Sequence, residues 1–137
     1  MIVTLDNIDD VVFDLHPGDR VFLRGDLGAG KTTFASKLIQ KHIGNTALHI
    51  TSPTYTYYQK YGGNLYHFDL YRAESAIDII RTGAQDIFDD ESSICIIEWP
   101  EILWETVQPT ITIDIAPAEL WREFRIVNCQ AAKIDNL

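Results

Sequence analysis

The segment Gly25-Asp26-Leu27-Gly28-Ala29-Gly30-Lys31-Thr32 has residue types and a spacing that point directly to phosphate chemistry. Two glycines five positions apart, followed by Lys and Thr, are typical of a phosphate-binding loop. Glycines lack a Cβ, so the backbone N–H groups of the loop can turn inward around an anion. Lys31 would reach the β- and γ-phosphates, and the Thr32 hydroxyl would hold Mg²⁺. The sequence therefore predicts a nucleotide site; the alternative is a glycine-rich turn that only joins a strand to a helix.

Two apolar runs end in an acid, and these acids are candidates for work on a bound nucleotide. The runs are Leu65-Tyr66-His67-Phe68-Asp69 and Ile94-Cys95-Ile96-Ile97-Glu98. In an open α/β sheet, sites gather at the carboxyl ends of the strands, so both acids are expected to face the phosphates. One carboxylate could orient Mg²⁺ and the other the attacking water. The residues alone do not decide which acid has which role, and a solvated acid at a strand end is the simpler alternative.

The segment Thr51-Ser52-Pro53-Thr54 offers three hydroxyl groups on a stiff turn. One of them could approach the γ-phosphate or the metal, as in segments that respond to a bound nucleotide. Ordinary turn chemistry explains the same residue types. Trp99, directly after Glu98, is expected to shape the site or to pack in the core.

Periodicity and turn residues predict the elements that must position these side chains. Strands are expected at residues 20–24, 54–61, 65–71, 94–97, 110–115 and 123–126, and helices at 8–15, from the loop to Gly44, and from 76 to Gly83, with a helical turn near 87–88. Gly62-Gly63 is expected to join two strands of a hairpin, and the last two strands should pair antiparallel. Strands of the parallel type early and an antiparallel pair late predict an α/β fold with a mixed sheet.

Composition limits what the chain can be. It has 137 residues, 46% of them hydrophobic and 23% charged, which suits one domain over residues 1–137 with a buried core. The formal charge of −9 should repel nucleic acid over most of the surface. We expect a cytosolic protein with two unpaired thiols, because neither a membrane span nor a signal peptide is evident and Cys95 and Cys129 are the only cysteines. The four histidines have no metal-ligand spacing and are expected to be ordinary, partly buried imidazoles.

Four segments together resemble the bacterial TsaE (YjeE) ATPases. They are Gly25-Asp26-Leu27-Gly28-Ala29-Gly30-Lys31-Thr32-Thr33, Ser52-Pro53-Thr54-Tyr55, His67-Phe68-Asp69-Leu70-Tyr71-Arg72 and Glu98-Trp99-Pro100-Glu101. Many families carry a phosphate loop, whereas its combination with the Asp-Leu-Tyr-Arg and Glu-Trp segments is specific. The resemblance covers most of the chain. One departure is Ile102, where many relatives are expected to have a basic residue.

This resemblance implies a P-loop NTPase-like mixed sheet, with a parallel core and antiparallel additions, flanked by helices. It implies a cytoplasmic, Mg²⁺-dependent ATPase that takes part in making N6-threonylcarbamoyladenosine (t6A) at adenosine 37 of tRNA. ATP hydrolysis would support turnover of the TsaD–TsaB protein complex, and tRNA would be contacted mainly through these partners. The implied catalytic residues are Lys31, Asp69, Glu98 and Thr54; the metal residues are Thr32, Asp69 and Glu98; and Thr33 and Trp99 join the loop in holding the nucleotide. Arg122 or Arg125 would correspond to a late family arginine.

Two other functions fit a phosphate loop. A small-molecule or nucleoside kinase usually needs a lid that supplies arginines, whereas the six arginines here are scattered and no segment looks like a lid. A non-catalytic assembly module would use nucleotide binding alone to stabilise a docked state. The sequence contains no obvious arginine finger, so we expect slow hydrolysis until a partner orders the switch segment or completes the charge clamp.

Overall fold

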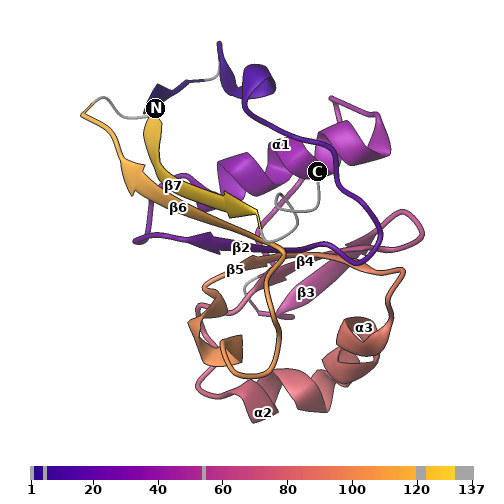
Figure 1. Cartoon of the computed structure of the whole chain (residues 1–137). Coiled ribbons are helices and arrows are strands. Elements are labelled where there is room, and N and C mark those ends of the chain that lie inside the picture. The colour runs from indigo at the N-terminus through magenta and orange to yellow at the C-terminus, as the bar shows by residue number, and fades with distance from the viewer. Residues whose placement is uncertain (1, 5, 54, 120–122, 132–137) are drawn as a thin grey trace.

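A seven-stranded mixed sheet forms the centre of the molecule (Figure 1). The computed structural model describes residues 2–4, 6–53, 55–119 and 123–131. The strand order is β1-β7-β6-β2-β5-β4-β3. The strands are Ile2–Val3 (β1), Arg20–Arg24 (β2), Tyr58–Tyr61 (β3), Leu65–Asp69 (β4), Ile94–Glu98 (β5), Ile111–Pro117 (β6) and Phe124–Ala131 (β7). The four neighbours β6, β2, β5 and β4 run parallel, and antiparallel strands extend the sheet at both ends. The expected mixed sheet is confirmed.

Helices are few among the residues that the structure describes, so the expected flanking by helices holds only in part. Helix α1 (Lys31–Ile43) lies on one face of the sheet. On the other side lie two short helices, α2 (Ala76–Ile79) and α3 (Gln85–Asp89), joined by the π-helical turn η2 (Ile80–Ala84) (Figure 1). The interruption expected at Gly83 is present as a positive φ of 93° within η2. Single 3₁₀ turns, η1 (Ile8–Asp10) and η3 (Pro100–Leu103), complete the described helical elements.

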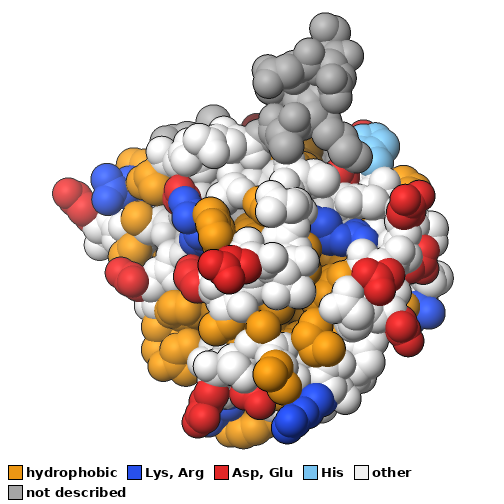
Figure 2. All heavy atoms as spheres, turned by 60° about the horizontal axis from the view of Figure 1, so that its bottom comes forward, with side chains coloured by type: hydrophobic (Ala, Val, Ile, Leu, Met, Phe, Trp, Pro, Cys, Tyr) orange, Lys and Arg blue, Asp and Glu red, His pale blue; other side chains and the backbone are white. Residues whose placement is uncertain are grey.

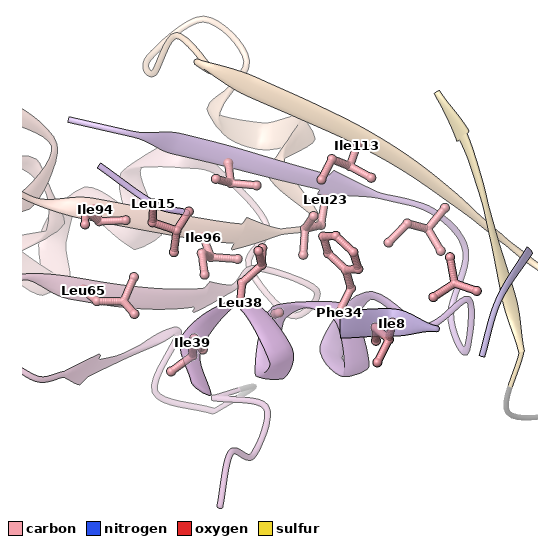
Figure 3. Close-up of a cluster of buried hydrophobic side chains, with 14 of the residues drawn as sticks. Ile8, Leu15, Leu23, Phe34, Leu38, Ile39, Leu65, Ile94, Ile96 and Ile113 are labelled. Carbon is pink, nitrogen blue, oxygen red and sulfur yellow. The ribbon is translucent and has the colours of Figure 1, made fainter. Parts of the chain in front are cut away.

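The face under α1 carries the larger of two buried clusters. Phe34 and Leu38 from α1 pack against Leu23 of β2 and Ile96 of β5 (Figure 3). These side chains are completely buried, so α1 is held against the sheet along the strands that lead to the phosphate loop. Burial of each such side chain contributes about 1.5–3 kcal/mol. The second cluster, around Phe22, Phe68 and Ile79, fills the space between the sheet and α2. Both faces of β2, β4 and β5 are therefore fixed by packing.

The helix expected over residues 8–15 is wrong: only the turn η1 forms, and residues 12–16 are irregular. The Asn7 side chain does not cap the η1 turn, because its amide group makes hydrogen bonds to Thr4 and to Ile2 of β1 instead. Asn7 Oδ1 accepts from Thr4 N at 2.7 Å, and Nδ2 donates to Ile2 O at 3.0 Å. Val11 and Val12 nevertheless pack against the cluster beneath α1. Their apolar spacing therefore reflects burial without helix formation.

The two strands of the hairpin are shorter than expected, although the Gly62-Gly63 connection is confirmed. β3 starts at Tyr58, because Tyr57 has a positive φ of 68° that breaks the extended backbone. β4 stops at Asp69, whose Oδ1 accepts the backbone N–H of Tyr71 at 3.0 Å. A side chain that bonds the backbone two residues on makes a turn of the Asx type. Both differences lie where the strands meet the site.

Within the described residues, no helix combines the length and the apolar character that crossing a bilayer requires. Cys95 and Cys129 are both free, as expected. Burial of the Cys95 thiol raises its pKa to about 11, so it stays a protonated, apolar part of β5 at neutral pH.

Candidate functional site

The phosphate loop connects β2 to α1 and depends on two glycines. Gly30 has a φ of 105°, and a Cβ built on it would lie 2.7 Å from the Phe124 ring of β7. Gly25 has a φ of 156°, and its Cβ would lie 2.3 Å from the carbonyl oxygen of Ile115 in β6. The neighbouring strands β6 and β7 thus lie so close to the loop that a side chain at Gly25 or Gly30 would clash with them. Helix α1 begins at the next residue, Lys31, so its N-terminal backbone amides and dipole point toward the loop.

Lys31 is buried beside the loop. Its Nζ donates to the carbonyl oxygens of Gly25 at 2.5 Å and Asp26 at 2.8 Å. The ammonium also lies 4.1 Å from the centre of the Trp99 ring, within the range of a cation–π contact. Burial lowers the pKa of Lys31 below its ordinary value, and attraction to Glu98 and other acids opposes that shift. The ammonium is therefore held at the loop mainly by neutral oxygens and an aromatic face.

Asp69 and Glu98 lie side by side. They are the last residues of β4 and β5, and the parallel register pairs them directly. Both are nearly inaccessible, at 5% and 2% exposure. Oε1 of Glu98 accepts the Thr32 hydroxyl at 2.8 Å, so the second acid contacts the first turn of α1. The sheet thus brings the two candidate acids together, and Glu98 contacts Thr32, the residue that is expected to hold Mg²⁺.

Asp69 accepts hydrogen bonds of its own. Asp69 Oδ2 accepts the Ser52 hydroxyl, and Asp69 Oδ1 accepts the Tyr71 backbone N–H. Ser52 belongs to the hydroxyl-rich segment, and the structure places this segment at the site through that contact. Thr54, predicted to act in catalysis from the same segment, lies outside the described residues.

His67 is the residue whose role the sequence pattern did not reveal. Its Nε2 lies 2.5 Å from Oε2 of Glu98, and its side chain is completely buried. The expectation of an ordinary, partly buried imidazole is therefore wrong for His67. A signal existed, because His67 stands two residues before Asp69 and alternate residues of a strand share a face.

Trp99 forms one wall of the site. It has a left-handed backbone (φ 57°, ψ 55°), which is rare for a bulky residue and turns the chain from β5 into η3. Its ring lies 5.0 Å from that of Tyr71, centre to centre. A non-glycine residue in this conformation is often found where function constrains the backbone. In this protein, the left-handed backbone at Trp99 places its ring against the Lys31 ammonium and the Tyr71 ring.

A pocket of about 380 Å³ opens between these elements. It is lined by Leu27, Gly28, Gly30, Lys31, Thr32, Thr33, Ser52, Asp69, Tyr71, Glu98 and Trp99. Most of the predicted site residues are therefore together; Asp26 contributes a carbonyl to Lys31, and Ala29 is buried in the loop. Arg125 is exposed on β7 and does not line the pocket, and Arg122 lies outside the described residues.

The residues present fit magnesium bound together with phosphate. Among the described residues, no cluster of three or more His, Cys, Asp or Glu side chains could hold a metal alone. The pocket instead offers two carboxylates, Asp69 and Glu98, and several hydroxyls, among them that of Thr32, and all of these are hard oxygen donors. Mg²⁺ typically takes one or two carboxylates, several waters and the phosphates of a substrate. Thr32, Asp69 and Glu98 would hold it in that way.

The glycine loop, the helix start and the paired acids define a mixed α/β domain that is consistent with the P-loop-like folds. The sequence model of the family described as "Threonylcarbamoyl adenosine biosynthesis protein TsaE" matches residues 4–124. The chain belongs to the TsaE family, whose members are named as proteins of tRNA threonylcarbamoyladenosine (t6A) biosynthesis.

Named relatives agree with this family. The chain is 38% identical over 101 residues to the tRNA threonylcarbamoyladenosine biosynthesis protein TsaE of Rickettsia typhi, covering 72% of this chain and 68% of that protein. It is 45% identical over 86 residues to the protein of the same name in Haemophilus influenzae, covering 59% of this chain and 51% of the relative. The Treponema pallidum protein of that name is 38% identical over 109 residues, covering 74% and 75%.

Replacing Gly30 with alanine should destabilise the loop. The new Cβ would clash with the Phe124 ring, and alanine is strained in the left-handed backbone conformation of Gly30. We therefore expect a loss of about 2–4 kcal/mol in the free energy of unfolding. Urea denaturation measures it. Gly63→Ala is the matched control, because a Cβ added there would meet no atom within 4 Å, and it should change stability by less than about 0.5 kcal/mol. Equal effects of the two substitutions would contradict the tight packing of the loop.

Proposed function

We propose that this chain is a cytoplasmic P-loop ATPase, one domain over residues 1–137, that hydrolyses ATP with Mg²⁺ in t6A biosynthesis. The observation that carries the proposal is the meeting of Lys31, Thr32 and the in-register acids Asp69 and Glu98 in one pocket. A glycine-rich turn that merely joined a strand to a helix would not need two buried carboxylates beside it. The family name and the names of the relatives support the place of this chemistry in tRNA modification.

The side chains divide the work as follows. The loop amides and the Lys31 ammonium bind the phosphates, and Lys31 exchanges its two carbonyl contacts for phosphate oxygens. Mg²⁺, when bound, neutralises charge that develops on the phosphates. Thr32, Asp69 and Glu98 would hold it, and one of the two carboxylates would orient the attacking water. Trp99 and Tyr71 cover the side of the pocket and limit the access of water.

The partners are part of the proposal. Lys31 is the sole basic residue among the described residues that line the pocket, so the charge clamp for the transition state is incomplete. We infer that the TsaD–TsaB complex completes it or orders the segment near Ser52. On the face shown in Figure 2, Lys and Arg side chains lie scattered among acidic and hydrophobic ones, without a basic stripe. With a net charge of −9, this favours tRNA contact through the partners.

Lys31→Ala should weaken ATP binding. The variant loses a charge-assisted contact worth about 1.5–3 kcal/mol, so Kd for ATP with Mg²⁺ should rise about 10- to 100-fold. Isothermal titration calorimetry measures the Kd. Lys41→Ala, at the exposed far end of the same helix, is the control and should bind as the wild type does. Unchanged binding by the Lys31 variant would remove the basis of the proposed site.

Glu98→Gln should separate binding from hydrolysis. The amide keeps the size of the side chain and an oxygen for the metal but cannot serve as a base, so we expect kcat to fall about 100-fold or more and Kd for ATP with Mg²⁺ to rise far less than that. Steady-state phosphate release measures kcat, and Glu105→Gln on the exposed surface is the control. If the Glu98 variant still supports full tRNA modification, hydrolysis is dispensable and the chain acts as a nucleotide-gated assembly module.

Addition of the TsaD–TsaB pair should raise the ATPase rate at least about tenfold, because supplying a missing cation or ordering a switch segment can accelerate hydrolysis far more than that. Phosphate release is measured with the chain alone, with the pair alone and with all three proteins. The Lys31→Ala variant shows which component hydrolyses ATP. A rate equal to the sum of the separate rates would contradict partner stimulation.

A further inference from the structure

His67 and Glu98 form a buried pair beneath the first turn of α1. The side-chain exposures are 0% for His67 and 2% for Glu98, and Nε2 lies 2.5 Å from Oε2. His67 is in β4 and Glu98 in β5, two residues apart in register, because His67 pairs with Ile96. Since residues 65, 67 and 69 share one face of β4, the imidazole lies on the same side of the sheet as Asp69.

The two oxygens of Glu98 have different neighbours. Oε2 contacts His67, and Oε1 accepts the Thr32 hydroxyl on the pocket side. An ionised carboxylate only accepts hydrogen bonds, so the proton in the His67 contact belongs on Nε2. In the described part of the chain, Nδ1 of His67 has no hydrogen-bond partner. The imidazole therefore makes one directed contact, and that contact goes to Glu98.

We propose that His67 is the positioning residue of this site: its Nε2–H holds Oε2 of Glu98 and so fixes Oε1 toward Thr32 and the pocket. The proposal rests on the ATPase function proposed above. Without the imidazole, a buried carboxylate would lose a donor and could rotate away from Thr32. His67 reaches the reaction only through Glu98, since it does not line the pocket.

Three substitutions of His67 test the position of the donor. Gln puts an amide N–H near the place of Nε2, Asn puts one near Nδ1, and Leu supplies none. We expect kcat for ATP to fall about 10- to 100-fold in the Leu and Asn variants, with KM within about twofold, and to recover largely in the Gln variant. Equal kcat in the Asn and Gln variants, or a loss that appears in KM instead, would overturn the positioning role.

Two controls separate positioning from damage to the fold. Ile79→Val shortens a completely buried side chain in the cluster on the other face of the sheet, and it should leave kcat unchanged. In the Glu98→Gln background, His67→Leu should cost less than about twofold, because the carboxylate that it positions is already gone. A full additional loss in the double variant would show that His67 acts elsewhere.

A measurement without nucleotide decides the geometry. Nitrogen-15 NMR of the imidazoles shows which ring nitrogen of His67 carries the proton, with His67→Gln for assignment. We expect the proton on Nε2 and a changed resonance in the Glu98→Gln variant; a bare Nε2 would overturn the proposal. If the wild type hydrolyses ATP and His67→Leu matches it, the positioning role fails while the function stands. If the wild type does not hydrolyse ATP, the proposed ATPase function fails, and the NMR result alone tells whether His67 Nε2–H donates to Glu98.

Discussion

The parallel register of β4 and β5 is the constraint on which the site depends. It sets Asp69 opposite Glu98, both buried, at the edge of the sheet where α1 begins. Two neighbouring carboxylates in a poorly solvated place repel each other, so each needs donors. Ser52 and the Tyr71 backbone serve Asp69, and the Thr32 hydroxyl serves Glu98. A slip of one residue would turn either acid to the opposite face, and the packing of both strands on two clusters prevents it.

Much of this arrangement could be predicted from local pattern. The glycine spacing with Lys31 and Thr32 identified the loop, because few other functions need that combination. Continuous apolar runs identified the buried strands β2 and β5, and alternation identified the β6–β7 pair. Since parallel strands present their carboxyl ends at one edge, the meeting of Asp69 and Glu98 was also expected. Which acid would contact a bound metal first could not be predicted, because that depends on tenths of an ångström that no spacing encodes.

The rest depended on contacts between distant parts of the chain. Residues 8–15 have helical spacing, yet their apolar side chains are buried without a helix, and Asn7 binds β1. The burial of His67 required β4 to lie between β3 and β5 with α1 above it. Comparing the spacing of the histidines with that of metal ligands could not identify His67, because His67 contacts a single carboxylate, that of Glu98. The end of β4 at Asp69 likewise follows from a side-chain contact with Tyr71, not from any change in the apolar pattern.

The charges in the pocket also bear on the proposal that phosphate and a metal ion bind there together. Of the described lining residues, two are carboxylates and one is an ammonium, so a bare triphosphate would meet a net negative site on a protein of charge −9. The loop amides and the helix dipole favour the anion only locally. A divalent cation held by Asp69 and Glu98 would offset this repulsion between the acids and the phosphates. Under the proposed function, the paired acids would therefore serve both hydrolysis and the dependence of nucleotide binding on magnesium, and the geometry of β4 and β5 would set both properties together.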